Sequence, residues 1–182
     1  MDPMASLSTA KAEPLLAGGS RDNGSLSSQR AENAFVFRRG TSWEHHGSLD
    51  TFLHEAASKY SLPLAFLLAV IRVESNFNPR AVSRVGAIGL MQIMPRNIEM
   101  LRISDPYDPR QNILGGAHLL RLFANMWAGD LVLTLASYNA GPGAVRRALS
   151  EHGEKIPRFK ETRRYVQRVL RHYREFRIRL PP

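Results

Sequence analysis

The chain has 182 residues, of which 43% are hydrophobic and 23% are charged, and its formal net charge is +9. This length and balance predict one globular domain with its own core and room for a terminal extension. The absence of cysteine excludes disulfide bonds and thiolate metal sites. No stretch approaches the roughly 20 apolar residues of a membrane span, so we expect none.

Residues 1–47 are rich in Ser, Gly, Ala and Asn, and their few apolar residues show no periodicity. This composition predicts a flexible polar tail or linker ahead of a domain over residues 48–180. Glu44, His45 and His46 lie in this stretch, where nothing would fix their orientation as ligands, so we predict no metal site. We expect no signal peptide at the N-terminus, because charged residues interrupt its short apolar segments.

Helical periodicity begins after Ser48. The spacing of apolar residues from Leu49 predicts a helix that ends near Tyr60. Ser61 is the predicted N-cap of the next helix. The run from Leu64 to Ile71 is apolar on every side, which predicts a central, buried helix.

The remaining elements follow in chain order. Glycines and β-branched residues predict a small irregular hairpin near 84–93, and a short helix follows Pro95. Longer helices are predicted over about 113–127, after the capping residue Asp130, and from Pro142 to near Gly153. A last helix is predicted from about residue 161. The fold class is therefore all-α, with about seven helices and α+β character at most through the hairpin.

The positive charge is concentrated near the C-terminus. Residues 155–182 contain ten Lys or Arg and only two acids, Glu161 and Glu175. Such a basic end suggests an anionic partner, which could be nucleic acid, a membrane surface or an acidic polymer. A solvated helix face without a partner explains the same charges equally well.

Glu74 is the only acid between Val73 and Pro95, and it falls at the end of the buried helix. Desolvation and the negative end of the helix dipole both disfavour its charged form, so both should raise its pKa. A carboxyl that keeps its proton near neutral pH can act as a general acid. Position alone is equally compatible with a helix-end residue that faces water. Arg72 should point to a different face, so we do not expect it to neutralise Glu74.

Three sequence blocks around this acid resemble a known signature. The first holds Glu74-Ser75, Ala81-Val82-Ser83, Gly86-Ala87 and Gly89-Leu90-Met91-Gln92-Ile93-Met94-Pro95; the second is Ala136-Ser137-Tyr138-Asn139-Ala140-Gly141-Pro142-Gly143; the third holds Phe159, Glu161-Thr162-Arg163 and Tyr165-Val166. Their order and spacing resemble the Slt-type lytic transglycosylases, the lysozyme-like catalytic domains of soluble lytic murein transglycosylases. The resemblance covers about residues 49–175.

The resemblance implies that Glu74 is the sole catalytic acid and base. In this family the acid protonates the β-1,4 glycosidic oxygen between N-acetylmuramic acid and N-acetylglucosamine. It then takes the proton of the muramyl C6 hydroxyl, and a 1,6-anhydro sugar forms without water. Because the nucleophile comes from the substrate, the second carboxylate of ordinary glycosidases is not needed.

The resemblance also implies substrate-binding roles for other residues and no cofactor or metal. The predicted substrate-binding residues are Ser83, Gly86, Met91, Gln92, Tyr138, Asn139 and Glu161. Met91 and Gln92 are expected to line the groove, although a Met in such a block is more often a core residue. Tyr138 could instead be a packed aromatic. Glu161 could instead interact with the N-terminal dipole of the last helix.

The implied partner is a peptidoglycan glycan strand, so the expected location is periplasmic or extracellular. The family also includes short accessory enzymes that open the wall for a secretion machine or a phage. Two alternatives stay open, namely a hydrolytic muramidase and a non-catalytic module that binds glycan or nucleic acid. We expect no nucleic-acid partner, because the basic helix has few aromatic residues among its charges.

Overall fold

The computed structural model of the protein describes residues 49–180. The predicted tail over residues 1–47, with Glu44, His45 and His46, lies outside these described residues. Within the described part, the helices are α2 (Leu49–Tyr60), α3 (Leu64–Glu74), α4 (Pro95–Ile98), α5 (Pro109–Met126), α6 (Leu131–Ala140), α7 (Pro142–His152) and α8 (Lys160–Arg179). The only β pairing among the described residues consists of isolated bridges. The all-α prediction of about seven helices is therefore confirmed.

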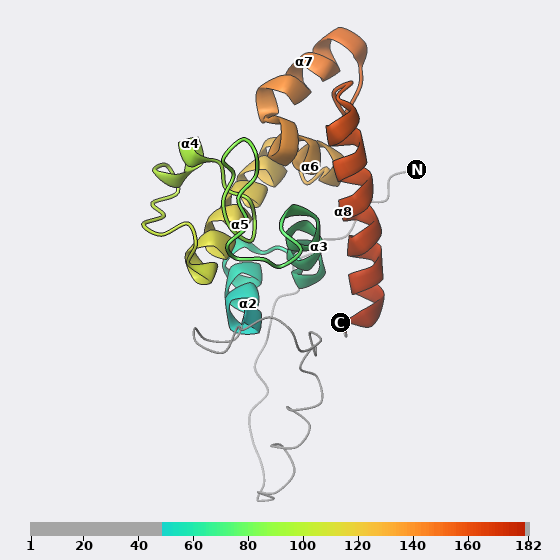
Figure 1. The fold of residues 1–182 in the computed structure, drawn as a ribbon. Helices are drawn as coiled ribbons and strands as arrows, with labels where there is room; N and C mark the ends of the chain where they lie inside the picture. Colours follow the sequence, from blue (N-terminus) through green and yellow to red (C-terminus); the bar gives the residue numbers. More distant parts are fainter. Residues whose placement is uncertain (1–48, 181–182) are drawn as a thin grey trace, which may run out of the picture. The chain divides into compact units, whose positions relative to one another are not determined.

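Helix α3 is the centre of the core, as its uniformly apolar sequence predicts. Residues 65–71 are all buried, and full burial of a large apolar side chain contributes roughly 1.5–3 kcal/mol. Helix α8 packs along α3, while α2 packs against α5 (Figure 1). Phe66 of α3 meets Tyr173 of α8 edge to face, with ring centroids 5.5 Å apart. Two helices distant in sequence are thereby fixed beside each other.

The connection between α3 and α4 forms the predicted irregular hairpin. Val82 bridges to Ile88, and Ile88 bridges to Ile93, both in antiparallel fashion. Gly89 has a φ of +80°, and a Cβ there would lie 2.2 Å from the Asn112 side-chain nitrogen. Because only glycine fits this backbone and this contact, the hairpin can lie directly against α5.

Two side-chain N-caps were predicted from the sequence, and the structure confirms one of them. Asp130 caps α6 by accepting hydrogen bonds from the amides of Val132 and Leu133, as predicted. The prediction that Ser61 caps α3 is wrong. Ser61 has a φ of +49° and ends α2 instead, where the amide of Leu62 reaches back to the carbonyl of Ala57.

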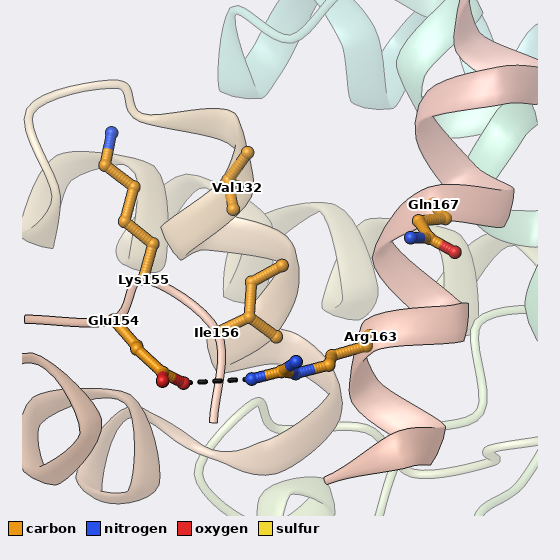
Figure 2. Close-up of a pocket in the computed structure, with 6 residues that line it drawn as sticks. All are labelled: Val132, Glu154, Lys155, Ile156, Arg163 and Gln167. Atoms are coloured by element: carbon orange, nitrogen blue, oxygen red, sulfur yellow. Dashed lines mark hydrogen bonds and ion pairs between the residues drawn. The ribbon is translucent and has the colours of Figure 1, made fainter. Parts of the chain in front are cut away.

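The connection between α7 and α8 is held by ion pairs around a surface hollow of about 400 Å³. The carboxylate of Glu154 meets the guanidinium of Arg163 at 2.9 Å, and Figure 2 shows this pair, with Gln167 one turn further along α8. The Lys155 ammonium lies 2.6 Å from the carboxylate of Asp130. These two ion pairs hold the segment between α7 and α8 in place, and Arg163 is therefore already paired within the fold. Separately, none of the helices in the described part is both long and apolar enough to cross a bilayer.

Candidate active site

Glu74 is the last residue of α3 and is only partly exposed. Burial is the largest influence on its carboxyl and raises the pKa from 4.5 to about 7. The direction agrees with the desolvation that the sequence predicts. A carboxyl with this pKa is present in both protonation states near neutral pH, so it can give a proton and later take one.

The hydroxyl of Tyr165 lies close to Glu74 from the buried side of α8. As a hydrogen-bond donor, this hydroxyl lowers the pKa of Glu74, and it is the largest influence that opposes burial. The hydroxyl is itself buried and has no well-aligned hydrogen bond among the described residues. The two groups are therefore near each other without forming a bond of good geometry. Tyr165 belongs to the third sequence block, yet the sequence analysis did not place it in the site.

Tyr138 of α6 is a second phenol near the acid. Burial and, to a lesser extent, the charge of Glu74 hold the pKa of Tyr138 well above its usual value. Its hydroxyl donates to the backbone carbonyl of Met91 at 2.8 Å. Tyr138 therefore connects the surroundings of Glu74 with the hairpin, which agrees with its predicted position near the acid.

Two charged residues of α8 act on Glu74 in opposite directions. The positive charge of Arg168 lowers the pKa of Glu74, whereas the negative charge of Glu161 raises it. Both side chains are exposed. Arg72 lies next to Glu74 in sequence but donates to the side chain of Asn76, so it does not neutralise the acid, as predicted.

The hairpin holds four of the predicted substrate-binding residues, and three of them are Ser83, Gly86 and Gln92. The Ser83 hydroxyl accepts a hydrogen bond from the amide of Ala87 at 3.0 Å and remains partly exposed. Gly86 has a φ of +81°, which favours glycine. The Gln92 side-chain nitrogen donates to the carbonyls of Ala81 and Gly89, so this amide braces the hairpin. Its carbonyl oxygen makes no such contact among the described residues and stays available as an acceptor.

The prediction that Met91 lines the groove is wrong for its side chain. Met91 has 0% exposure and belongs to the core. A Cβ at Gly116 would lie 2.4 Å from the Met91 sulfur, so α5 comes directly against this side chain. Only the carbonyl of Met91 serves the site, through Tyr138. The alternative of a core methionine is therefore correct.

Asn139 lies beside Tyr138 on α6, and its side chain is hydrogen-bonded to a residue of α8. Its side-chain oxygen accepts a hydrogen bond from the hydroxyl of Thr162 at 2.8 Å, and Thr162 is buried. This bond fixes the end of α6 against the start of α8. Asn139 therefore contributes to the placement of Tyr138 and Tyr165 on their two helices.

Asn112 of α5 is a site-supporting residue that the sequence analysis did not select. Its side chain is 1% exposed and makes three hydrogen bonds to the backbone. It accepts from the amide of Met91 at 2.7 Å and donates to the carbonyls of Ile88 and Pro106 at 3.0 and 2.8 Å. The signal was an amide in the middle of an apolar helical face, where a buried polar group requires partners.

Comparison with known protein families identifies the family of this chain. A family model described as a transglycosylase SLT domain matches residues 51–158, more than half of the chain. The chain belongs to this family. The matched part of the SLT domain ends before α8, so Tyr165, Arg168 and Glu161 lie beyond it.

Proteins similar in sequence to this SLT domain are named as transglycosylases. The soluble lytic murein transglycosylase of Escherichia coli K12 is 37% identical over 140 residues, covering 66% of this chain and 21% of that protein. The transglycosylase of Enterobacteria phage PRD1 is 43% identical over 86 residues, covering 47% of this chain and 32% of that protein. The chain therefore spans about a fifth to a third of the length of these relatives.

Solved structures share the fold of this SLT domain. The 70 kDa soluble lytic transglycosylase of Escherichia coli superposes with a TM-score of 0.64 at 33% identity, covering 71% of this chain and 24% of that one. An inactive Glu-to-Gln mutant of the lytic transglycosylase Slt from Pseudomonas aeruginosa gives a TM-score of 0.66 at 33% identity, covering 73% and 25%. The all-α, lysozyme-like architecture that the resemblance implied is thereby confirmed.

Proposed function

We propose that this protein is a peptidoglycan lytic transglycosylase that cleaves the β-1,4 bond between N-acetylmuramic acid and N-acetylglucosamine without water. The observation that carries the proposal is the buried carboxyl of Glu74, whose pKa burial raises to about 7. The names of the related proteins support the same chemistry. The inactivity of the Glu-to-Gln mutant of the Pseudomonas aeruginosa enzyme supports a glutamate as the essential group in that relative.

In the first step the Glu74 carboxyl gives its proton to the glycosidic oxygen while the bond from C1 to that oxygen breaks. In the second step the carboxylate takes the proton of the C6 hydroxyl on the same muramyl residue, and the C6 oxygen bonds to C1. Glu74 ends protonated, so the cycle is balanced and consumes no water. One carboxyl whose pKa lies near the working pH suits both transfers.

The neighbouring phenols support this cycle in different ways. The Tyr165 hydroxyl stabilises the carboxylate that exists between the two proton transfers, since it is the strongest group that lowers the pKa of Glu74. Tyr138 holds the hairpin next to the acid through the carbonyl of Met91. Ser83, Gly86, Gln92, Asn139 and Glu161 are the proposed substrate contacts.

A hydrolytic muramidase is the second candidate, and one observation favours it. The exposed carboxylate of Glu161 is near enough to Glu74 to raise the pKa of Glu74, so a second acid lies near the first. Such an acid could serve as the base for water. The two reactions differ in their products, because anhydro ends lack one water relative to hydrolytic ends.

The substrate places the proposed activity outside the cytoplasm, in the periplasm or the extracellular space. An accessory role for a phage or a secretion machine belongs to the same proposal. The similarity to a transglycosylase of phage PRD1 supports the phage role.

Mass spectrometry of the soluble products from purified sacculi tests the proposed reaction. We expect anhydromuramyl ends from the wild type and a loss of about a thousandfold or more in Glu74→Gln, which removes the proton but keeps the shape. Glu99→Gln, at an exposed acid after α4, is the matched control and should retain activity. Products with hydrolytic ends would favour the muramidase, and full activity in Glu74→Gln would end both assignments.

A further inference from the structure

Helix α8 carries a high density of cations on its solvent side. Eight of its residues are Lys or Arg and all are exposed, whereas its only acids are Glu161 and Glu175. Arg163 pairs with Glu154, and Arg177 lies over the ring of Tyr173. The other six form no ion pair within 4 Å and no hydrogen bond within residues 49–180, although Arg171 and Arg179 are near enough to Glu175 to act on its charge. We call these six residues the cationic face: Lys160, Arg164, Arg168, Arg171, Arg174 and Arg179.

The fold does not need the cationic face. The residues that pack α8 against α3 and α6 lie on its apolar side, and they include Tyr165, Val166 and Val169. Arg168, Arg171 and Arg174 are spaced three residues apart, and like charges at this spacing destabilise a helix. A repulsive row that the core does not use is explained by an anionic partner that neutralises it.

The composition of the face indicates the chemistry of this partner. Five of its six members are Arg rather than Lys. The planar guanidinium binds carboxylates and phosphates through two parallel hydrogen bonds, which an ammonium cannot do. Tyr165 and Phe176 of α8 are buried, and Tyr173 is partly buried against Phe66. The helix therefore presents no exposed tyrosine or phenylalanine ring on which nucleic-acid bases could stack. The apolar side of α8 is also in the core, so it is not free to enter a membrane.

The cationic face begins beside the proposed active site. Arg168 is near enough to Glu74 to lower its pKa, and it lies one turn beyond Tyr165. Arg171 and Arg174 follow about 9 and 14 Å beyond Tyr165 along the helix axis. A peptide stem of four or five residues, attached to the sugar at the active site, spans at most about 14–18 Å. A stem on the bound strand can therefore reach these arginines.

We propose that the cationic face of α8 binds the carboxylates of peptidoglycan peptide stems and so holds the wall strand while Glu74 acts on its glycan. The inference rests on the proposed function and extends it, because it names a part of the substrate other than the sugars to which the protein binds. The peptide stems, rather than the neutral sugars, supply the negative charge that the face requires.

A binding assay on two forms of the substrate tests this inference. The parent is the full chain with Glu74→Gln, which prevents turnover, and the test variant adds Arg171→Gln and Arg174→Gln. The matched control adds Arg96→Gln and Arg102→Gln, two exposed arginines at and after α4, which lies on the other side of the domain from α8 in Figure 1. Each protein is bound to intact sacculi and to glycan strands from which an amidase has removed the stems, at low and high salt.

We expect the test variant to bind intact sacculi about five- to tenfold more weakly at low salt, the loss expected for two exposed ion pairs. The difference should shrink at high salt and vanish on stem-free glycan. The control should bind as the parent does. Equal binding by test variant and parent, an equal loss on stem-free glycan, or stronger arginine-dependent binding to phosphatidylglycerol vesicles than to sacculi would overturn the inference.

The same proteins with Glu74 restored separate this inference from the proposed function. If the wild type releases anhydromuramyl products while the arginine variants bind normally, the proposed function stands and the role of the face is rejected. If the wild type releases no product while binding still depends on stems and arginines, the face is supported and the proposed function is rejected.

Discussion

The hydroxyl of Tyr165 on α8 is the group that most strongly opposes the effect of burial on Glu74 at the end of α3. Burial favours the neutral acid, whereas a nearby donor favours the carboxylate. The opposition brings the pKa of Glu74 to about 7, between the ordinary value of 4.5 and the higher value that burial alone would give. Two helices that are distant in sequence thus set the proton affinity of one side chain.

Tyr165→Phe should therefore raise the pKa of Glu74. The first chemical step needs the protonated acid, so the alkaline side of the kcat/KM profile should move to higher pH by about half a pH unit to one pH unit. The phenol hydroxyl is buried without a well-aligned partner, so the loss in stability should be small. Tyr107→Phe, at an exposed tyrosine, is the control. A profile that stays in place in Tyr165→Phe would show that this phenol does not act on Glu74.

The two charges that flank Tyr165 on α8 should shift the same profile in opposite directions. Arg168→Gln removes a charge that lowers the pKa of Glu74, so the alkaline side should move up. Glu161→Gln removes a charge that raises this pKa, so it should move down. Because both side chains are exposed, each shift should be only a few tenths of a pH unit, and smaller at high salt. Shifts of the same sign in both variants would contradict this arrangement.

Glu74 should also lower the stability of the folded protein as pH rises. Its folded pKa of about 7 exceeds the ordinary value of 4.5, so the folded state holds the proton more tightly than the unfolded state. The penalty is absent below pH 4.5, grows as pH rises to 7, and amounts to about 3 kcal/mol above that. Glu74→Gln should therefore stabilise the protein by up to about 3 kcal/mol at pH 8 and little at pH 4.

Denaturant unfolding of the wild type, Glu74→Gln and Glu99→Gln at these two pH values measures this effect. The exposed variant Glu99→Gln should show no gain at pH 8. If Glu74→Gln were stabilised equally at both pH values, the gain would come from packing and not from the buried charge.

Asn112→Ala should destabilise the hairpin that faces the site. It removes three hydrogen bonds and leaves the amide of Met91 and two carbonyls without their partner. Each buried group left without a partner costs about 1–3 kcal/mol, so the three together should lower the free energy of unfolding by about 3 kcal/mol or more. Asn125→Ala, at an exposed amide of the same helix, is the control. A loss below about 1 kcal/mol would show that the hairpin is held by other contacts.

Local patterns were enough to predict most of the fold. The uniformly apolar run of α3 predicted its burial, and Asp130 predicted the start of α6. Ser61 was assigned to the wrong helix because a Ser two residues before a Pro looks like an N-cap, whereas the end of α2 places it at a positive φ. The positive φ depends on the backbone of both helices, which a capping pattern does not describe.

The site was predicted in part for a similar reason. The position of Glu74 at the end of a buried helix indicated a raised pKa, but that position was equally compatible with a residue that faces water until the three sequence blocks were considered. The effect of Tyr165 depends on how α8 packs against α3, about 90 residues later in the chain. Met91 was assigned to the groove because the family resemblance implied it, but the close approach of Gly116 encloses its side chain. Such long-range contacts are not visible in local spacing.

The central claim is that burial keeps the proton on Glu74 near neutral pH. A ¹³C NMR titration of the labelled glutamate carboxyls, with the Glu74 signal assigned by its loss in Glu74→Gln, measures this pKa directly. The account predicts a midpoint of about 7 for Glu74 in the folded protein. A midpoint near the ordinary value of 4.5 would contradict it, because Glu74 would then be ionised at neutral pH and could not supply the first proton.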